Sequence, residues 1–253
     1  MKTFIRFYFI LVFTCLFLIV QVCMAVDDSL VLHFTFDEGA GNVVTDDSIY
    51  LNNGKFKANP KWVDGKSGKA LSFNAGDSVV IPSSDSLDIT KAITMEMWVK
   101  VTSSAEIKQA GIERGGWEVG EYSIYPFYEG GTVIQFFDLP PACGDAGIKG
   151  KSIQDGEWHY FTGTWDGKNI SLYIDGELDR SGGCDGQLKS SNTSVYIGSR
   201  NGGERFLTGV VDEVRIYNRG LTQAEVKKDM NTFGPLAVNH TKKLAICWGE
   251  VKH

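Results

Sequence analysis

The segment Ile93-Thr94-Met95-Glu96-Met97-Trp98-Val99-Lys100-Val101 decides the fold, because apolar residues occupy every second position along it. Side chains of a β-strand point alternately to its two faces. The pattern therefore predicts a strand with one buried face and one more hydrated face. Strands of this kind build antiparallel sandwiches, in which two sheets pack their apolar faces together.

The same period of two continues on both sides of this segment, at residues 32–36 and 170–174. Asp-Gly pairs separate the apolar stretches, at 64–65, 155–156, 166–167, 175–176 and 185–186. Asp-Gly tolerates positive φ and favours tight hairpins, so many short antiparallel strands are expected. One helix is also predicted, because Thr222-Gln223-Ala224-Glu225 is a capping box. It should end between Asn231 and Gly234, before Pro235.

The N-terminus has the pattern of an export signal. Lys2 and Arg6 precede an apolar run at 7–20, and Cys23-Met24-Ala25 offers small residues for cleavage after Ala25. The run is shorter than the roughly 20 residues of a spanning helix. An uncleaved anchor is the alternative, and a lipid on Cys23 is disfavoured by the bulky Val22. We predict a signal peptide at 1–25, one domain at 26–235 and a Lys-rich tail at 236–253.

Composition and charge limit the partners. The chain has 253 residues, of which 43% are hydrophobic, enough for one large sandwich with a real core. Loss of the signal removes two basic residues and no acid, so the net charge falls from −6 to −8. That balance argues against a nucleic-acid partner. No second apolar segment follows, so we expect no membrane span in a mature chain that is secreted or extracytoplasmic, including the cell surface or periplasm.

Three cysteines remain after removal of the signal: Cys143, Cys184 and Cys247. Cys143 and Cys184 lie in loops rich in Gly and Asp, and an oxidising compartment favours their pairing as a disulfide. Cys247 is then free or forms an intermolecular bond. The spacing of the cysteines and histidines does not match a zinc site.

Seven motifs, taken in order, resemble the laminin-G-like jelly-roll domains of the concanavalin A-like lectin/glucanase superfamily. The resemblance runs from about residue 30 to 230 and implies an all-β fold of two curved antiparallel sheets. It also implies binding of glycans or extracellular proteins. The motifs are Leu32-His33-Phe34-Thr35-Phe36-Asp37-Glu38-Gly39, Gly68-Lys69-Ala70-Leu71-Ser72-Phe73, residues 93–100, Gly156-Glu157-Trp158-His159-Tyr160, Leu172-Tyr173-Ile174-Asp175-Gly176, Val195-Tyr196-Ile197-Gly198 and residues 211–219.

A structural calcium is implied by a further likeness. Val211-Asp212-Glu213-Val214-Arg215 resembles the final strand of concanavalin-like glucanases, where the Asp supports calcium beside the N-terminal strand. Carried over, the ligands would be Asp212 and the turn Asp37-Glu38-Gly39. Calcium takes 6–8 oxygen ligands, and carboxylates beside Gly-rich backbone suit it. The alternative is that Asp37 and Asp212 only cap turns or pair with Arg215.

Residues 114–137 are dense in aromatics, which suggests a sugar-binding site. Trp117 and Tyr122 could stack on the C–H faces of a sugar ring. Arg114 and Glu118, together with Glu113, could supply the polar contacts. The alternative is that alternating aromatics fill the core, and we prefer it for Phe127, Phe136 and Phe137.

The sequence lacks the usual signatures of catalysis. Related glucanases carry Glu-x-Asp-x-x-Glu on one strand, whereas here Glu96 stands alone and the adjacent Asp212 and Glu213 point to opposite faces. The sequence also has no Gly-x-Ser-x-Gly elbow and no His-Glu-x-x-His pair. We therefore predict a non-catalytic binding module for carbohydrate. A structural or protein-interaction domain is the first alternative, and a glycoside hydrolase the second.

Overall fold

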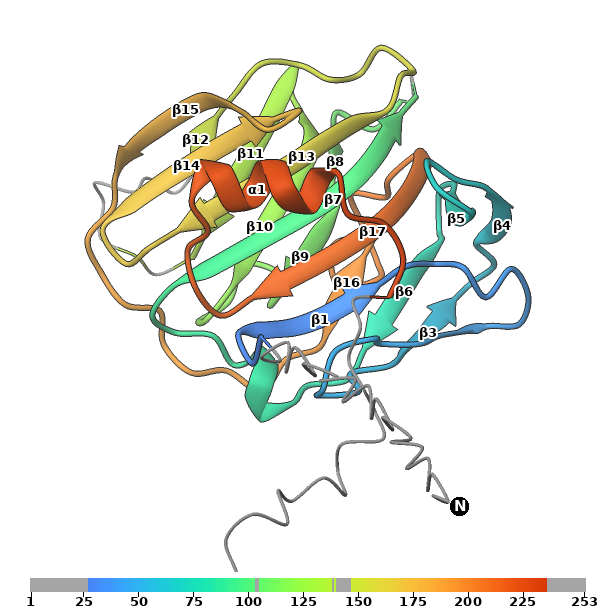
Figure 1. Cartoon of the computed structure of the whole chain (residues 1–253), viewed down its shortest axis with the longest axis horizontal. Helices are drawn as coiled ribbons and strands as arrows, with labels where there is room; N and C mark the ends of the chain where they lie inside the picture. The colour runs from blue at the N-terminus through green and yellow to red at the C-terminus, as the bar shows by residue number, and fades with distance from the viewer. Residues whose placement is uncertain (1–26, 103–104, 138, 140–146, 236–253) are drawn as a thin grey trace, which may run out of the picture.

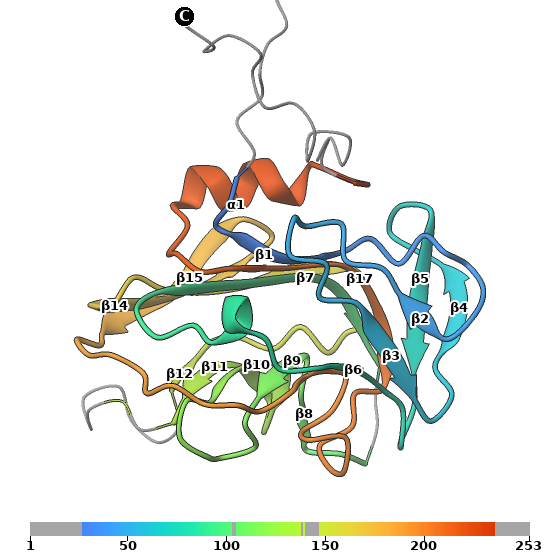
Figure 2. The ribbon, with the colours of Figure 1, turned by 90° about the horizontal axis from the view of Figure 1, so that it is seen from below.

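The computed structural model describes residues 27–102, 105–137, 139 and 147–235. Two antiparallel sheets stack face to face, and one short helix lies on the outer side of one of them (Figures 1 and 2). This is the predicted all-β sandwich with a single C-terminal helix. The predicted signal peptide, the tail, Cys143 and Cys247 lie outside the described residues.

Sheet A has eight strands in the order β15-β14-β13-β7-β17-β5-β4, with β1 paired to β17. The predicted central strand is β7, which lies between β13 and β17. The bounds are β1 Leu30–Phe34, β4 Lys61–Asp64, β5 Lys69–Phe73, β7 Ile93–Val101, β13 His159–Trp165, β14 Asn169–Ile174, β15 Glu177–Gly183 and β17 Gly209–Tyr217.

Sheet B has nine strands in the order β12-β11-β10-β9-β16-β6-β3-β2, with β8 paired to β10. A short 3-10 turn, η1 (Asp85–Leu87), follows β6. The bounds are β2 Val43–Val44, β3 Gly54–Lys57, β6 Ser78–Ile81, β8 Lys108–Gln109, β9 Ile112–Arg114, β10 Tyr122–Tyr128, β11 Gly131–Phe136, β12 Ile148–Lys149 and β16 Val195–Ile197.

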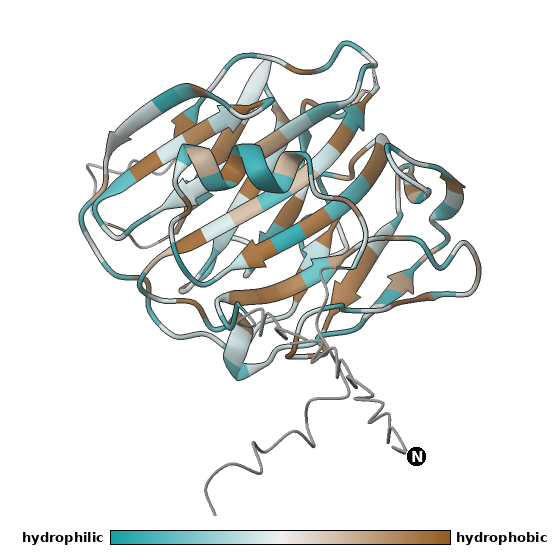
Figure 3. Cartoon of the chain, in the orientation of Figure 1, coloured by the Kyte–Doolittle hydropathy of each residue, from teal (hydrophilic) through white to brown (hydrophobic). Residues whose placement is uncertain are grey.

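The core lies between the sheets, and the alternation along β7 supplies part of it. Met95, Met97 and Val99 are fully buried there, as their spacing predicts. Hydrophobic and hydrophilic residues alternate along the sheet strands in Figure 3. Burial of a side chain of this size contributes about 1.5–3 kcal/mol, so this layer is the main source of stability.

The second face of β7 is not hydrated, which corrects the expectation from the sequence. Glu96 is fully buried and Trp98 is 7% exposed, because α1 (Gln223–Met230) covers this face of sheet A (Figure 2). Val226 of α1 joins Trp98 in a second apolar cluster with the outer side chains of sheet A. The alternation of residues along one strand does not predict that a helix from a distant part of the sequence will cover its polar face.

The helix itself matches its prediction. Thr222 is the N-cap, its hydroxyl accepts from the backbone N–H of Glu225, and the Glu225 carboxylate accepts from the backbone N–H of Thr222. The helix is capped at its C-terminal end by Asn231. Below it, buried Arg215 donates to Glu213 (2.7 Å) and to the carbonyl of Thr232 (2.6 Å), so the end of the helical segment is fastened to β17.

The hairpin between β14 and β15 shows how Asp-Gly directs the chain. Asp175 and Gly176 have φ of 55° and 75°, and Ile174 pairs directly with Glu177. Two successive positive φ values are the geometry of the tight hairpin turn that Asp-Gly favours. Among the described residues, no helix has the length and apolar character needed to cross a membrane.

Candidate functional site

The four residues predicted to bind sugar separate into two surface and two interior residues. Trp117 and Glu118 are exposed on the loop that joins β9 to β10. Arg114 and Tyr122 are fully buried. The prediction that Arg114 and Tyr122 contact a ligand is therefore wrong.

Strand register explains this burial. Arg114 pairs with Tyr122 across β9 and β10, and both side chains point to the inner side of sheet B. Both Arg114 Nη atoms donate to Asp88 Oδ1 at 3.1 Å, and Nη2 also donates to the carbonyl of Ser191 at 2.6 Å. The hydroxyl of Tyr122 donates to the carbonyl of Leu87 at 3.1 Å. Arg114 and Tyr122 thus hold the segment around η1 in place.

Trp117 is the exposed aromatic of this region. Its side chain is 36% exposed and lies edge-on to Phe137, with ring centroids 5.1 Å apart. The guanidinium of Arg200 lies 6.0 Å from the Trp117 ring. Phe137 is half-buried beside Trp117, so our preference for a core position is wrong for it. Phe136 lies in the core, and Phe127 packs against it.

The backbone at Trp117 is strained. Its φ is +72°, in the left-handed region, where a side chain costs roughly 1–2 kcal/mol. The preceding Gly115 and Gly116 also have positive φ, and Gly116 lies against the side chain of Asn201, leaving no room for a Cβ. The backbone N–H of Trp117 donates to the Glu121 carboxylate. Among the described residues, eight other non-glycine residues also have positive φ, buried Phe36 included, so Trp117 is distinguished by combining this strain with an exposed aromatic side chain.

A buried polar network lies beside Trp117 on the outer side of sheet B. Glu113 points outward because its neighbour Arg114 points inward. Its Oε2 accepts from the hydroxyl of Tyr125 at 2.8 Å, and its Oε1 lies 3.2 Å from Arg200 Nε. Arg205 donates to the same Tyr125 hydroxyl at 2.8 Å. Two guanidinium groups and a phenol therefore surround one carboxylate.

Burial shifts the acids of this network. Desolvation, and next the nearby Glu121 charge, raise the pKa of Glu113 to about 8. Desolvation also raises the pKa of Glu121 to about 7, against the lowering effect of Arg200. Within the described part of the chain, Glu121 Oε2 and the hydroxyl of Ser199 are buried without a hydrogen-bond partner. The site thus combines an exposed aromatic side chain with a buried polar network beside it.

Sequence reasoning missed Glu121, Arg200 and Arg205 as members of this site. Arg200 and Arg205 flank a tight loop in which Arg200 and Glu204 form an isolated bridge. That loop follows β16, more than 70 residues after β9 in the sequence. Its position becomes visible only when β16 is placed beside β9, where Tyr196 pairs with Glu113.

The four residues implied as calcium ligands are only partly brought together. Asp212 Oδ2 accepts from the backbone N–H of Ser67 at 3.1 Å, and Asp37 Oδ1 accepts from that of Lys69 at 2.8 Å. Both carboxylates therefore reach the same turn. Glu38 binds the backbone N–H of Thr45 instead, at 2.6 Å. Gly39 supplies a positive φ of 64°, with the stem of Lys69 beside it.

The donor set fits calcium in part. Asp212 is fully buried, and burial raises its pKa to about 7. Its Oδ1 has no hydrogen-bond partner among the residues that the structure describes. Within the described ranges, no three His, Cys, Asp or Glu side chains lie close enough to hold a metal together. Carbonyl oxygens and water would have to complete the shell around Asp212 and Asp37.

A family model described as the concanavalin A-like lectin/glucanases superfamily matches residues 73–227, more than half of the chain. The chain belongs to this superfamily. None of the curated proteins matches its sequence.

Solved structures share the superfamily fold. Domain 4 of AbnA, a GH43 extracellular arabinanase from Geobacillus stearothermophilus in complex with arabinotriose, has a TM-score of 0.62 and 21% identity. It covers 80% of this chain, and 98% of that domain is matched. The binding domain of Paraclostridial Mosquitocidal Protein 1 has a TM-score of 0.64 and 19% identity, with 81% of this chain covered. Trypanosoma rangeli sialidase in complex with the inhibitor DANA has a TM-score of 0.58 and 17% identity, and the match covers 79% of this chain.

The matched lengths differ between these structures. This chain spans about half of the toxin binding domain, at 52%, and 32% of the sialidase chain. At these identities the likeness establishes the superfamily fold and carries no residue of a binding site.

Proposed function

We propose that this chain is a secreted, non-catalytic carbohydrate-binding module that binds through the surface around Trp117. The observation that carries the proposal is Trp117 itself, which is exposed, strained and placed beside buried polar groups. A large aromatic held at an energetic cost in an exposed position indicates a contact surface.

The chemistry of the surface suits a sugar. The apolar face of a sugar ring can pack on the indole of Trp117, whose amphipathic ring tolerates a wet surrounding. Sugar hydroxyls both donate and accept, so they can donate to the exposed Glu118 and Glu204 carboxylates and accept from the partly exposed Arg200 guanidinium. Exposed Glu118 and Glu204 add carboxylates at the rim. Because burial raises the pKa of Glu113 and Glu121 to about 8 and 7, the exposed Glu118 and Glu204 roughly balance the guanidiniums of Arg200 and Arg205, which favours neutral glycans over charged ones.

Two structural neighbours support a binding role. The arabinanase domain carries arabinotriose and is matched over almost its entire length. The mosquitocidal protein neighbour is named as a binding domain. These are properties of those proteins, and they make glycan binding the first activity to test here.

A glycan array followed by calorimetry tests the proposal. Wild-type protein should bind a subset of neutral glycans, and Trp117→Ala should weaken binding at least about tenfold, or 1.4 kcal/mol. Phe233→Ala is the matched control, because Phe233 is an exposed aromatic stacked on Trp98, on the side of sheet A. Equal affinities of wild type and Trp117→Ala would move the site elsewhere. Binding to extracellular proteins stripped of glycans would favour the protein-interaction alternative.

The non-catalytic part of the proposal rests on accessibility. Glycoside cleavage needs two carboxyl groups flanking the scissile bond. Glu113 and Glu121 have no exposed surface, and Glu96 is buried below α1. Prolonged incubation with the bound glycan should release no reducing ends, and sustained release by pure protein would contradict this part.

We further propose a structural calcium at Asp212 and Asp37. A cation would partner the free Asp212 Oδ1 and hold the turn at residues 65–69 against β17. A ligand that binds only the folded state raises the melting temperature with concentration. Calcium should therefore raise the Tm of wild type and have little effect on Asp212→Asn, while magnesium serves as control. Identical Tm values in calcium and in chelator would contradict the proposed calcium site.

A further inference from the structure

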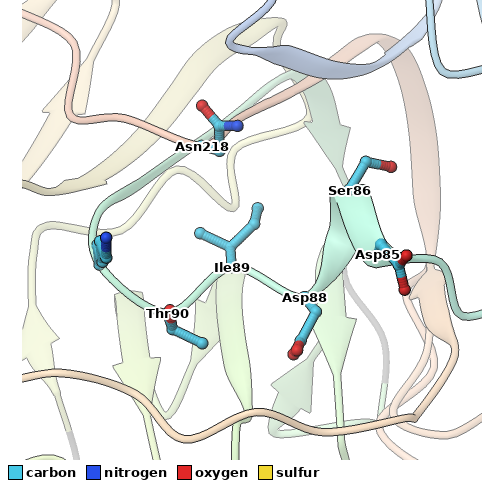
Figure 4. A pocket seen from close by; sticks show the side chains of 7 residues that line it. Asp85, Ser86, Asp88, Ile89, Thr90 and Asn218 are labelled. Atoms are coloured by element: carbon cyan, nitrogen blue, oxygen red, sulfur yellow. The ribbon is translucent and has the colours of Figure 1, made fainter.

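A hollow that shares no lining residue with the Trp117 surface lies where the chain passes from η1 into β7. Its volume is about 260 Å³. Residues 85–91 curve around it and Asn218, just after β17, closes the ring (Figure 4). The side chain of Ile89 points toward Asn218 in this view. Its lining is Asp85, Ser86, Asp88, Ile89, Thr90, Lys91 and Asn218.

The lining has unused hydrogen-bonding capacity. Within the described part of the chain, the side chains of Asp85, Thr90, Lys91 and Asn218 make no hydrogen bond or ion pair. They offer a carboxylate, a hydroxyl, an ammonium and an amide. Ile89, only 4% exposed, supplies an apolar contact among them. The hollow therefore presents donors and acceptors around one apolar side chain.

The wall of the hollow is held by hydrogen bonds, of which the one from Arg114 comes from a fully buried side chain. Asp88 is bound by Arg114, by the backbone N–H of Ser191 at 3.0 Å and by the hydroxyl of Ser190. The Thr90 carbonyl accepts from Leu188 N at 3.0 Å. A site that is already ordered loses little conformational entropy on binding, which favours affinity.

We propose that this hollow binds one neutral polyhydroxylated ring, such as a single sugar unit. Its volume is below the roughly 300–1,000 Å³ of pockets for drug-sized ligands, so the ligand is small. Ring hydroxyls donate to Asp85 and the Asn218 carbonyl oxygen and accept from Lys91 and the amide nitrogen. Asp85 and Lys91 are exposed and opposite in charge, so neither anions nor cations are favoured. The site shares no residue with the Trp117 surface and stands independently of it.

Amide NMR of the ¹⁵N-labelled mature protein tests the inference, with D-glucose, D-galactose, L-arabinose and myo-inositol as probes. At least one probe should shift the amides of residues 85–91 and 218. Asn218→Ala removes hydrogen bonds to the ligand and should weaken the affinity about three- to tenfold. Thr90→Val, of equal volume, should weaken it in the same direction. Asn42→Ala is the matched control, because Asn42 is an exposed asparagine on the loop before β2.

The outcomes separate this inference from the proposed function. Shifts limited to residues 115–121 and 199–205 would overturn the second site and leave the Trp117 surface supported. A stronger response to glycine or sulfate than to every neutral probe would also overturn it. No shift with any probe would do the same, while the glycan array would still decide the fate of the Trp117 surface. Shifts at 85–91 that persist in Trp117→Ala support two separate sites.

Discussion

At the scale of residues, Trp117 combines an unfavourable backbone conformation with an exposed aromatic side chain. Its backbone is left-handed, and its indole is exposed beside Phe137. The composition around it, with Gly before and Glu after, is visible in the sequence and led to the prediction of Trp117 and Glu118 as sugar-binding residues. The strain was not visible, because tryptophan has no intrinsic preference for positive φ that a sequence could reveal.

The strain at Trp117 gives a first prediction. Glycine adopts positive φ without a Cβ clash, whereas alanine does not. Trp117→Gly should therefore be more stable than Trp117→Ala by about 0.5–1 kcal/mol in urea unfolding, although both should lose glycan binding. A Trp117→Ala protein that is the more stable of the two would show that this backbone is relaxed in solution.

Arg114 shows where residue-level reasoning failed. A polar residue next to a cluster of aromatics reads equally well as a ligand contact or as a buried structural group. The face of β9 to which each side chain points decides between these two roles. Glu113 and Arg114 would exchange faces if the strand register slipped by one residue.

Removal of Arg114 should be costly. Its guanidinium is fully buried and binds the partly exposed Asp88. Breaking a buried ion pair by removing one partner costs about 3–5 kcal/mol, and the exposure of Asp88 places Arg114→Ala near the lower end. Arg114→Lys keeps the charge and should lose less. A loss below about 1 kcal/mol for Arg114→Ala in chemical unfolding would contradict the structural role.

At the scale of elements, the strands and the helix were predictable and their packing was not. The period of two located β7, β14 and β1, and the capping box located α1. The docking of α1 over β7 could not be predicted, because it depends on contacts between residues more than 100 positions apart, such as Thr94 with the carbonyl of Arg219. The polar face of β7 is therefore buried as well, between sheet A and α1.

The capping box gives a prediction at this scale. Thr222→Ala removes the side chain that accepts from Glu225 N and should reduce the free energy of unfolding by about 1 kcal/mol. Thr222→Ser keeps the hydroxyl and is the matched control. Thermal unfolding of the three proteins measures the difference. Equal Tm values would mean that the helix is held by its contacts with sheet A alone.

At the scale of the whole molecule, buried acids predict how stability depends on pH. Glu113, Glu121 and Asp212 have folded-state pKa values of about 8, 7 and 7, far above those of unfolded carboxyls. The folded protein holds these protons after the unfolded chain has lost them. Stability should therefore fall as pH rises from about 6.5 to 8, by at most about 1.4 kcal/mol per pH unit for each proton.

Between about pH 6.5 and 8 the histidines do not reverse the expected fall in stability. Hydrogen bonds to Asp175 and Asp155 raise the pKa of His159 against desolvation, so its contribution is also lost as pH rises. Burial lowers the pKa of His33, which costs stability only below about pH 6.5. Glu113→Gln should flatten the pH profile of urea unfolding, whereas the exposed Glu157→Gln should leave it unaltered. A profile that rises toward pH 8 would contradict the assignment.

The fold was readable because its signals are distributed along the whole chain, in strand alternation, turns and ordered motifs. The site was only partly readable because it is assembled from loops after β9 and β16 whose sequences carry little periodicity. The Trp117 surface is the site at which we propose that this sandwich binds its ligand.

A crystal structure of the protein with the strongest glycan from the array tests that claim most directly. We expect a sugar ring packed on the Trp117 indole, with its hydroxyls toward Glu118 and Arg200. Density for the glycan on any other surface, with Trp117 bare, would contradict it.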